Sequence, residues 1–167
     1  LGVRCLRQPE DFFDVVTDMG DAMAAENIRY AEVTWTPQFY LNRGHPLDAI
    51  LLAMNTARAE ARNSLGIEMR WIPDLVRSYP APARYVTDWA CSPPARTGGI
   101  VAPGLGGREQ EHPASEFLPH LVRPRAHKDI SAASALFEDL RQRRGVPEAV
   151  YAVGRIWLHP QQIAHEP

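Results

Sequence analysis

A short glycine-rich run is the clearest candidate for ligand chemistry in this sequence. Gly104, Gly106 and Gly107 follow closely on an apolar segment at 99–102. Glycine has no Cβ and tolerates positive φ, so such a loop lets the backbone approach a ligand. An ordinary turn after a strand would look the same. Because no Gly-x-Gly-x-x-Gly pattern is completed and no lysine follows, a phosphate-binding loop is not indicated.

The histidines make a weaker case for a metal site. His120 and His127 are seven residues apart, a spacing that puts them on one face of an unbroken helix, but Pro124 lies between them. Three further histidines have no cysteine or carboxylate at ligand spacing: His112, His159 and His165. We therefore expect histidines that face solvent or make structural hydrogen bonds, and we assign no metal ligand.

Arg29 and Glu32 could be interpreted as a catalytic pair within a predicted strand. Alternate strand residues point to opposite faces, so residues three apart do not share a face. We therefore expect structural hydrogen bonds for both. Core packing is the expected role of the four tryptophans, which are Trp35, Trp71, Trp89 and Trp157.

Helical and strand-forming segments alternate along the chain. Apolar periodicity, proline at helix starts and glycine beyond helix ends predict helices over 9–26, 46–63, 80–92 and 131–144, with a further helix after Pro113. Runs of β-branched and aromatic residues predict strands at 28–35, 67–75, 99–102 and 149–158. Strands separated by helices cannot form hairpins, so parallel βαβ units and the α/β class are predicted.

Composition limits the classes of protein that fit. The chain has 167 residues, 45% of them hydrophobic, which predicts one domain over 1–167. Its net charge of −2 gives no field for gathering nucleic acid. Only Cys5 and Cys91 are present, so free thiols in a reducing compartment are expected. No apolar run reaches the roughly 20 residues needed to cross a membrane. A cytoplasmic protein is the expectation.

Three blocks of sequence stand in a characteristic order and spacing. The first runs from Arg29 to Val33 and continues with Thr36-Pro37. The second leads from Gly66-Ile67 to a strand ending near Arg77. The third joins 99–101, the glycines of 104–107 and the stretch from His112 to Phe117. Together these blocks resemble the second to fourth barrel strands of the adenosine deaminase family, and its bacterial branch in particular, over roughly residues 8–126 and more weakly towards 167.

The resemblance implies a partial (β/α) TIM-type barrel with parallel strands, corresponding to about strands 2–6 of eight, with the site at the carboxyl ends of the strands. In that family a zinc-activated water attacks C6 of adenosine, a carboxylic acid protonates the ring nitrogen, and ammonia leaves. Gly107 aligns with the family residue whose backbone N–H approaches the purine. The resemblance therefore implies substrate contacts at Gly104, Gly106 and Gly107, with a purine nucleoside as ligand.

The family's catalytic motifs do not carry over to this chain. No His-x-His pair occurs, and the resemblance places the segment that would hold it before Leu1 and the paired aspartates beyond Pro167. Where the family has His-Ala-Gly-Glu, residues 125–131 read Arg-Ala-His-Lys-Asp-Ile-Ser, and where it has Gly-His-Gly, residues 150–153 contain no histidine. No catalytic residue is assigned, and no zinc is expected for this chain although the family uses it.

These observations lead to three alternative hypotheses for the function. The first is a deaminase-like barrel portion that is catalytically incompetent alone and self-associates through its open strand edges. The second is an active deaminase of adenosine or a related aminopurine, completed by another chain or by residues outside this one. The third is a non-catalytic purine-binding or scaffold protein that uses the glycines of 104–107.

Overall fold

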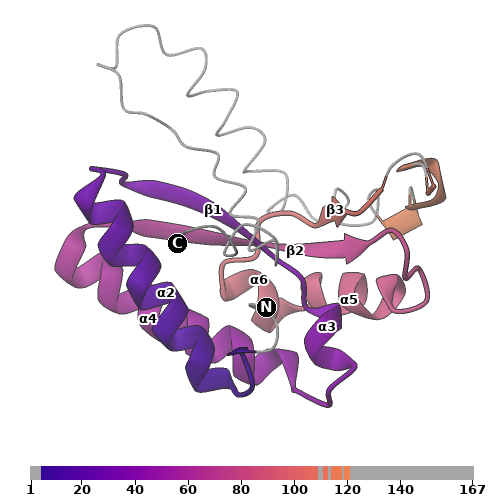
Figure 1. Ribbon diagram of the computed structural model, residues 1–167, viewed down its shortest axis with the longest axis horizontal. Helices are drawn as coiled ribbons and strands as arrows, with labels where there is room; N and C mark the ends of the chain where they lie inside the picture. Colours follow the sequence, from indigo (N-terminus) through magenta and orange to yellow (C-terminus); the bar gives the residue numbers. More distant parts are fainter. Residues whose placement is uncertain (1–4, 109–110, 113, 118, 121–167) are drawn as a thin grey trace, which may run out of the picture.

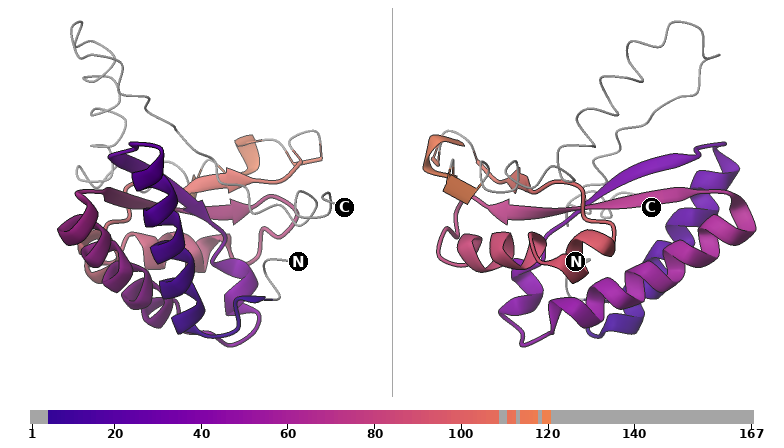
Figure 2. Two further views of the ribbon diagram at one scale, coloured as in Figure 1. Left: turned by 60° about the vertical axis from the view of Figure 1, so that its left-hand side comes forward. Right: turned by 180° about the vertical axis from the view of Figure 1, so that it is seen from behind.

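The computed structural model describes residues 5–108, 111–112, 114–117 and 119–120, and within them a parallel sheet is covered by helices on one face (Figure 1). The sheet has three strands in the order β1-β2-β3. Figure 2 shows from two further directions that α2, α4, α5 and α6 lie on the same face. The strands are β1 (Tyr30–Trp35), β2 (Glu68–Val76) and β3 (Gly104–Gly106). The helices are α2 (Pro9–Ala25), α3 (Gln38–Leu41), α4 (Leu47–Leu65), α5 (Ala83–Ala90), α6 (Pro93–Thr97) and the 3₁₀ helix η1 (Ala114–Phe117).

The two long helices begin and end where their sequence predicts. At the start of α2 the Asp11 carboxylate accepts hydrogen bonds from the backbone N–H groups of Arg7 at 2.6 Å and Gln8 at 3.0 Å. Carboxylates at this position satisfy N–H groups that have no partner within the helix. Helix α4 stops at Gly66, whose φ of 67° is the left-handed conformation that glycine favours. The predictions of helices over 9–26 and 46–63 are confirmed.

Strands β1 and β2 form the parallel pair that the alternation of elements predicts. Their register runs from Tyr30 opposite Glu68 to Trp35 opposite Pro73. In β2 every second residue is buried against the helices, including Met69, Trp71 and Leu75. The intervening residues lie on the opposite side, here called the inner face: they are Glu68, Arg70, Ile72, Asp74 and Val76.

The third strand lies further along the chain than the sequence predicts. Instead of a strand at 99–102, Ile100 makes only an isolated bridge to Trp71, and the regular pairing begins at Gly104 opposite Asp74. Pro103 stands between them and has no N–H to donate, so the hydrogen-bond ladder is interrupted there. Of the glycines predicted as a loop, Gly104 and Gly106 therefore lie in strand β3, and Gly107 follows it.

The predicted helix over 80–92 is also divided. Helix α5 ends at Ala90 and α6 begins at Pro93, because consecutive prolines supply no donors to continue the first helix. The Ser92 side chain caps α6 by accepting from the N–H of Ala95 at 3.4 Å. After Pro113 the structure describes η1. The predicted helix at 131–144, the predicted strand at 149–158 and Trp157 lie outside the described residues.

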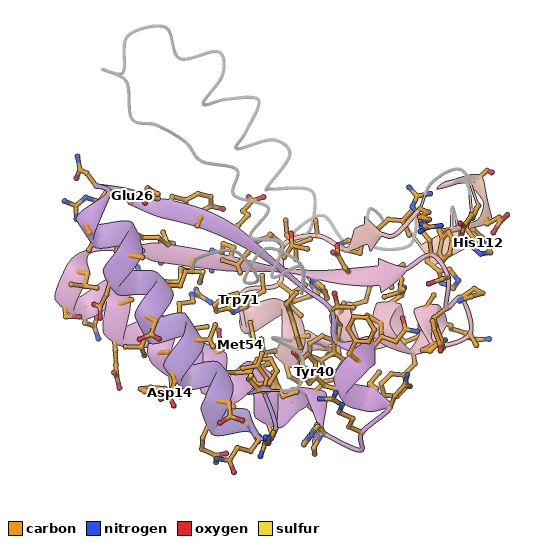
Figure 3. The ribbon with its side chains drawn as sticks, viewed as in Figure 1. Asp14, Glu26, Tyr40, Met54, Trp71 and His112 are labelled. Atoms are coloured by element: carbon orange, nitrogen blue, oxygen red, sulfur yellow. The ribbon has the colours of Figure 1, made fainter. Side chains whose placement is uncertain are left out.

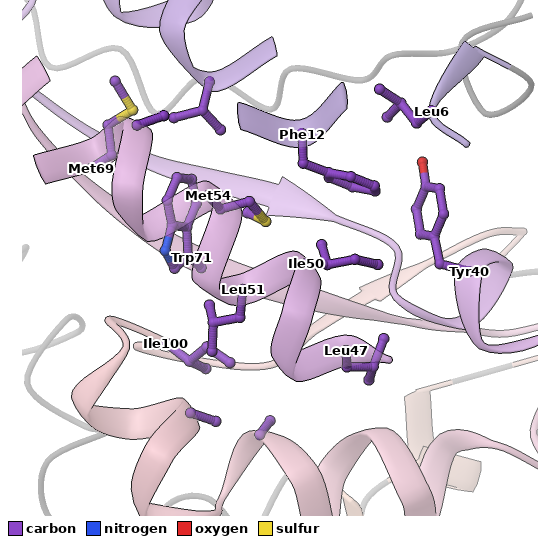
Figure 4. Packing of buried hydrophobic residues seen from close by; sticks show 14 of the residues in the cluster. Leu6, Phe12, Tyr40, Leu47, Ile50, Leu51, Met54, Met69, Trp71 and Ile100 are labelled. Carbon is purple, nitrogen blue, oxygen red and sulfur yellow. The ribbon is translucent and has the colours of Figure 1, made fainter. Parts of the chain in front are cut away.

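The main core lies between the sheet and the pair α2 and α4 (Figure 4). Trp71 is fully buried, and its indole N–H donates to the Asn55 side chain of α4 at 2.8 Å. Trp89 of α5 donates to Asp48 at 2.7 Å. The expected packing role is thus confirmed for these two tryptophans. Cys5 and Cys91 are not joined in a disulfide bond, and no helix of the described ranges combines the length and apolar character needed to cross a membrane.

Candidate active-site face

The glycines at 104 and 106 face a carboxylate on the neighbouring strand. Gly104 lies opposite Asp74 in the register, and a Cβ added at Gly104 would overlap the Oδ1 atom of that side chain. A Cβ at Gly106 would lie 3.3 Å from its Oδ2 atom. The Asp74 side chain therefore occupies the space that side chains on β3 would fill. Steric room for this carboxylate explains why small residues stand there.

Gly107 is constrained in a different way. Its φ is 109°, a conformation that L side chains rarely adopt, and an added Cβ would lie 3.2 Å from the Cβ of Arg77. Arg77 follows directly on β2 and is 7% exposed. Its backbone N–H donates to the carbonyl of Gly106 at 2.9 Å, so the ends of the two strands are joined immediately before the turn at Gly107.

The Arg77 side chain also fixes the chain that follows β3. Its Nη1 donates to the backbone carbonyl of His112 at 2.5 Å. His112 lies beyond the carboxyl ends of β2 and β3 (Figure 3), and its ring nitrogen is 3.3 Å from a carboxylate oxygen of Glu116. One arginine thus holds residues on both sides of Gly107. Arg77 and Asp74 were not assigned as site residues from sequence, although strand alternation places Asp74 on the polar face of β2.

A second polar cluster lies at the amino ends of the strands, opposite the glycines. Glu68 forms ion pairs with Arg58 at 2.9 Å and Arg70 at 3.1 Å. The pKa of the Arg58 guanidinium is lowered, chiefly because burial disfavours its charge. The Tyr30 hydroxyl donates to Glu32 at 2.9 Å. The pKa of Tyr30 is raised, mainly because the hydroxyl is buried and secondly because of this hydrogen bond. These groups pair with one another and belong to the structural frame.

Arg29 and Glu32 have different partners, as expected for structural residues. Arg29 donates to the Leu65 carbonyl at 2.9 Å and to the Asn27 side chain at 3.0 Å. The first of these bonds ties the segment before β1 to the end of α4. The expectation of structural hydrogen bonds is confirmed for both residues.

The described residues do not provide the donor set of a zinc site. In those ranges no group of three or more His, Cys, Asp or Glu side chains is arranged to hold a metal ion. Catalytic zinc sites take three protein ligands and keep one position open for water. His112 pairs with Glu116. Three histidines considered from sequence, His127, His159 and His165, lie outside the described residues.

Comparison with known proteins gives a consistent set of relatives. A family model described as adenosine deaminase matches residues 1–134. The aminodeoxyfutalosine deaminase of Streptomyces avermitilis is 32% identical over 126 residues, covering 72% of this chain and 34% of that protein. The adenine deaminase of Bordetella avium is 30% identical over 173 residues, covering 98% of this chain and 53% of that protein.

Solved structures agree with the fold. An adenine deaminase from Arthrobacter aurescens superimposes with a TM-score of 0.60 at 25% identity, covering 77% of this chain and 37% of that one. A zinc-bound amidohydrolase from Burkholderia ambifaria gives a TM-score of 0.61 at 27% identity, covering 76% and 33% of the two chains. The parallel strands and their helices are thus part of a TIM-barrel architecture. The chain spans about a third of the length of several of these proteins.

Proposed function

Because this chain belongs to the adenosine deaminase family, we propose that it builds the purine-facing part of a deaminase-type barrel and does not deaminate purines by itself. The observation that carries the proposal is the arrangement at the carboxyl ends of the parallel strands. There the glycines of 104–107 carry no side chains, the Asp74 carboxylate lies over Gly104 and Gly106, and the Arg77 N–H donates to the Gly106 carbonyl just before the turn at Gly107.

This arrangement suits a flat heterocyclic ligand. In (β/α) barrels the site lies at the carboxyl ends of the strands, which is the end of the sheet that Gly106 and Gly107 occupy. A backbone without side chains lets a ring system approach closely, and backbone N–H groups can donate to its ring nitrogens. The glycine conformation at 107 is the part of this surface that no other residue would reproduce without strain.

The chemical step demands more than this surface offers. Water is a poor nucleophile at neutral pH, and a bound zinc ion in the family supplies the acidity that activates it. The described side chains do not fit such an ion, so no step through it is assigned to them. Turnover would require ligands from outside the described residues, either elsewhere in the polypeptide or in another chain.

Metal analysis and a purine assay on the same sample test the proposal. We expect substoichiometric zinc, no loss of adenosine or adenine absorbance, and saturable adenosine binding that persists after chelator treatment. Stoichiometric zinc together with turnover would show that the chain is a complete enzyme and would overturn the proposal.

Substitution of Gly107 tests the binding surface directly. Gly107→Val should weaken adenosine binding at least about tenfold, because the side chain strains the positive φ and meets Arg77. Gly44→Val is the matched control, since Gly44 also has positive φ, at 78°, but a Cβ there meets nothing within 4 Å. Equal binding by the Gly107 variant and the control would contradict the proposal.

A further inference from the structure

We propose that Gln38 is a positioning residue, whose side-chain amide holds the turn over 76–79 in the place that the Gly107 backbone requires. The inference rests on the proposed function and deepens it, because this turn supports the purine-facing surface. Its starting point is a buried amide beyond the carboxyl end of β1. Gln38 begins α3, and only 2% of this residue is exposed.

The Gln38 side chain joins two loops that are far apart in the sequence. Its Nε2 atom donates to the backbone carbonyl of Tyr79 at 3.2 Å, across 41 positions of sequence. The nitrogen rather than the oxygen must face this carbonyl, because only the NH2 group of a side-chain amide can donate. The loop after β1 is thus tied to the loop after β2.

The turn that Gln38 holds supports Gly107 directly. The N–H of Tyr79 donates to the last residue of β2 at 2.9 Å and closes the turn. Within the turn lies Arg77, whose N–H donates to the Gly106 carbonyl at 2.9 Å and whose Cβ lies 3.2 Å from where a Gly107 Cβ would be. A displacement of the turn would therefore move the backbone on which the proposed purine surface depends.

Helix α3 gives the amide a firm base. Tyr40 is 5% exposed, and its ring packs edge-on against Phe12 of α2. Leu41 packs against a second cluster of buried residues, which contains Leu75 of β2 and Phe117 of η1. The helix that carries Gln38 is therefore fixed on two groups of core residues.

A contribution to stability alone does not account for a glutamine at this position. Its Oε1 atom is buried and has no hydrogen-bond partner among the described residues. An unpaired buried polar atom destabilises a fold, whereas methionine, which is similar in length and unbranched, would fill the space without one. The amide is therefore explained by the position that its nitrogen gives to Tyr79.

Gln38→Met separates positioning from stability. We expect the Arg77 and Tyr79 amides to exchange with solvent at least about tenfold faster, as measured by hydrogen exchange, because the turn loses its tie. The amide of Trp71, further back on β2, donates to Gly99 at 3.0 Å and should be unchanged. Adenosine should bind at least about fivefold more weakly in calorimetric titration, while the melting temperature stays within about 3 °C of that of the unaltered chain.

Two further variants serve as controls. Gln8→Met is the matched substitution, because Gln8 lies exposed at the start of α2, and it should change neither amide exchange in the turn nor adenosine affinity. Arg58→Met should lower stability at the amino ends of the strands and should also leave the affinity unchanged. If Gln38→Met does not fold, the unaltered chain still decides. The side-chain amide protons of Gln38 should exchange at least about tenfold more slowly than those of Gln8, and equal rates overturn the inference.

The outcomes distinguish this inference from the proposed function. Faster exchange in the turn together with weaker adenosine binding supports Gln38 as a positioning residue. If the unaltered chain binds adenosine, unchanged exchange or unchanged affinity in Gln38→Met overturns the inference and leaves the proposed function in place. An unaltered chain that binds no adenosine overturns both.

Discussion

At the scale of single residues, the glycines of β3 make room for a carboxylate of the neighbouring strand. Asp74 lies opposite Gly104 in the register, and its Oδ1 atom occupies the place that a Gly104 side chain would take. This register pairs residues thirty positions apart, so the sequence alone does not explain why Gly104 is small. Only the alternation of residues along β2 places Asp74 on the same face.

Gly104→Ala should destabilise the fold by about 1–3 kcal/mol, because the added methyl group overlaps the Asp74 carboxylate and forces it to move. Chemical denaturation measures the change. In an Asp74→Ala background the same substitution should cost much less, since the obstructing atoms are gone. Equal costs in the two backgrounds would show that the overlap is not the cause.

Burial of Tyr40 makes the stability of the folded chain depend on pH in the alkaline range. It is 5% exposed, its ring lies 4.7 Å from that of Phe12, and burial raises its pKa to about 12. The folded state therefore holds the phenol proton more tightly than the unfolded state does. The stabilisation of the folded state by the protonated Tyr40 is present below pH 10 and is lost as the pH rises through 12.

Between pH 9 and pH 11 the wild-type chain should thus lose about 1 kcal/mol more stability than Tyr40→Phe, as followed by urea denaturation at each pH. The pKa of Tyr30 is also raised, and this group remains in the variant. The comparison therefore isolates Tyr40. Parallel pH profiles for the two proteins would contradict the assignment.

At the scale of elements, periodicity predicted the long helices and the first two strands, and it failed where pairing decides. Phe12 and Val16 recur at helical spacing, and both are buried on α2 as that spacing requires. The third strand was misplaced because 99–102 is as apolar as a strand. Whether 99–102 forms a regular strand depends on Pro103 and on which residues of β2 the segment lies opposite. Local sequence does not reveal that pairing.

Arg58 connects three elements and gives a prediction at this scale. From α4 it donates to Glu68 of β2 at 2.9 Å and to the Gly98 carbonyl after α6 at 3.2 Å. Its side chain is 13% exposed. Arg58→Met should therefore destabilise the chain by about 2 kcal/mol, because Glu68 loses a partner in a partly buried setting.

The control for Arg58 is Arg84→Met on α5. Arg84 also pairs with an acid, but its side chain is 82% exposed and the distance is 3.7 Å. Exposed pairs contribute little to stability. Thermal unfolding of both variants should show a clear decrease in melting temperature for Arg58→Met alone, and similar decreases would contradict the structural role of Arg58.

At the scale of the whole molecule, the described sheet has two outer edges. In the described ranges β1 and β3 each pair only with β2. In a closed barrel every strand has two neighbours, and open edges present backbone groups that can pair with another chain. The segment predicted as a later strand, 149–158, lies outside the described residues.

We therefore predict that the isolated chain self-associates. Sedimentation velocity should show species larger than a monomer, in proportions that increase with protein concentration. Val33→Lys would add a charge to β1, but it does not test pairing at the open edge, because Val33 packs against the core. The more direct observation is the unaltered chain: a stable monomer at all concentrations, with a cooperative melt, would contradict the prediction.

The contact between Trp35 and Trp89 gives the molecule an optical signature. The two indole rings, one from β1 and one from α5, lie 6.0 Å apart at an interplanar angle of 83°. Electronic transitions of two aromatic rings so close and so inclined couple, and the coupling should appear as a paired positive and negative band in the circular dichroism spectrum. Trp89→Phe should abolish that pair of bands. The spectrum of the unaltered protein therefore reports, without any added label, whether α5 is docked on the rest of the fold.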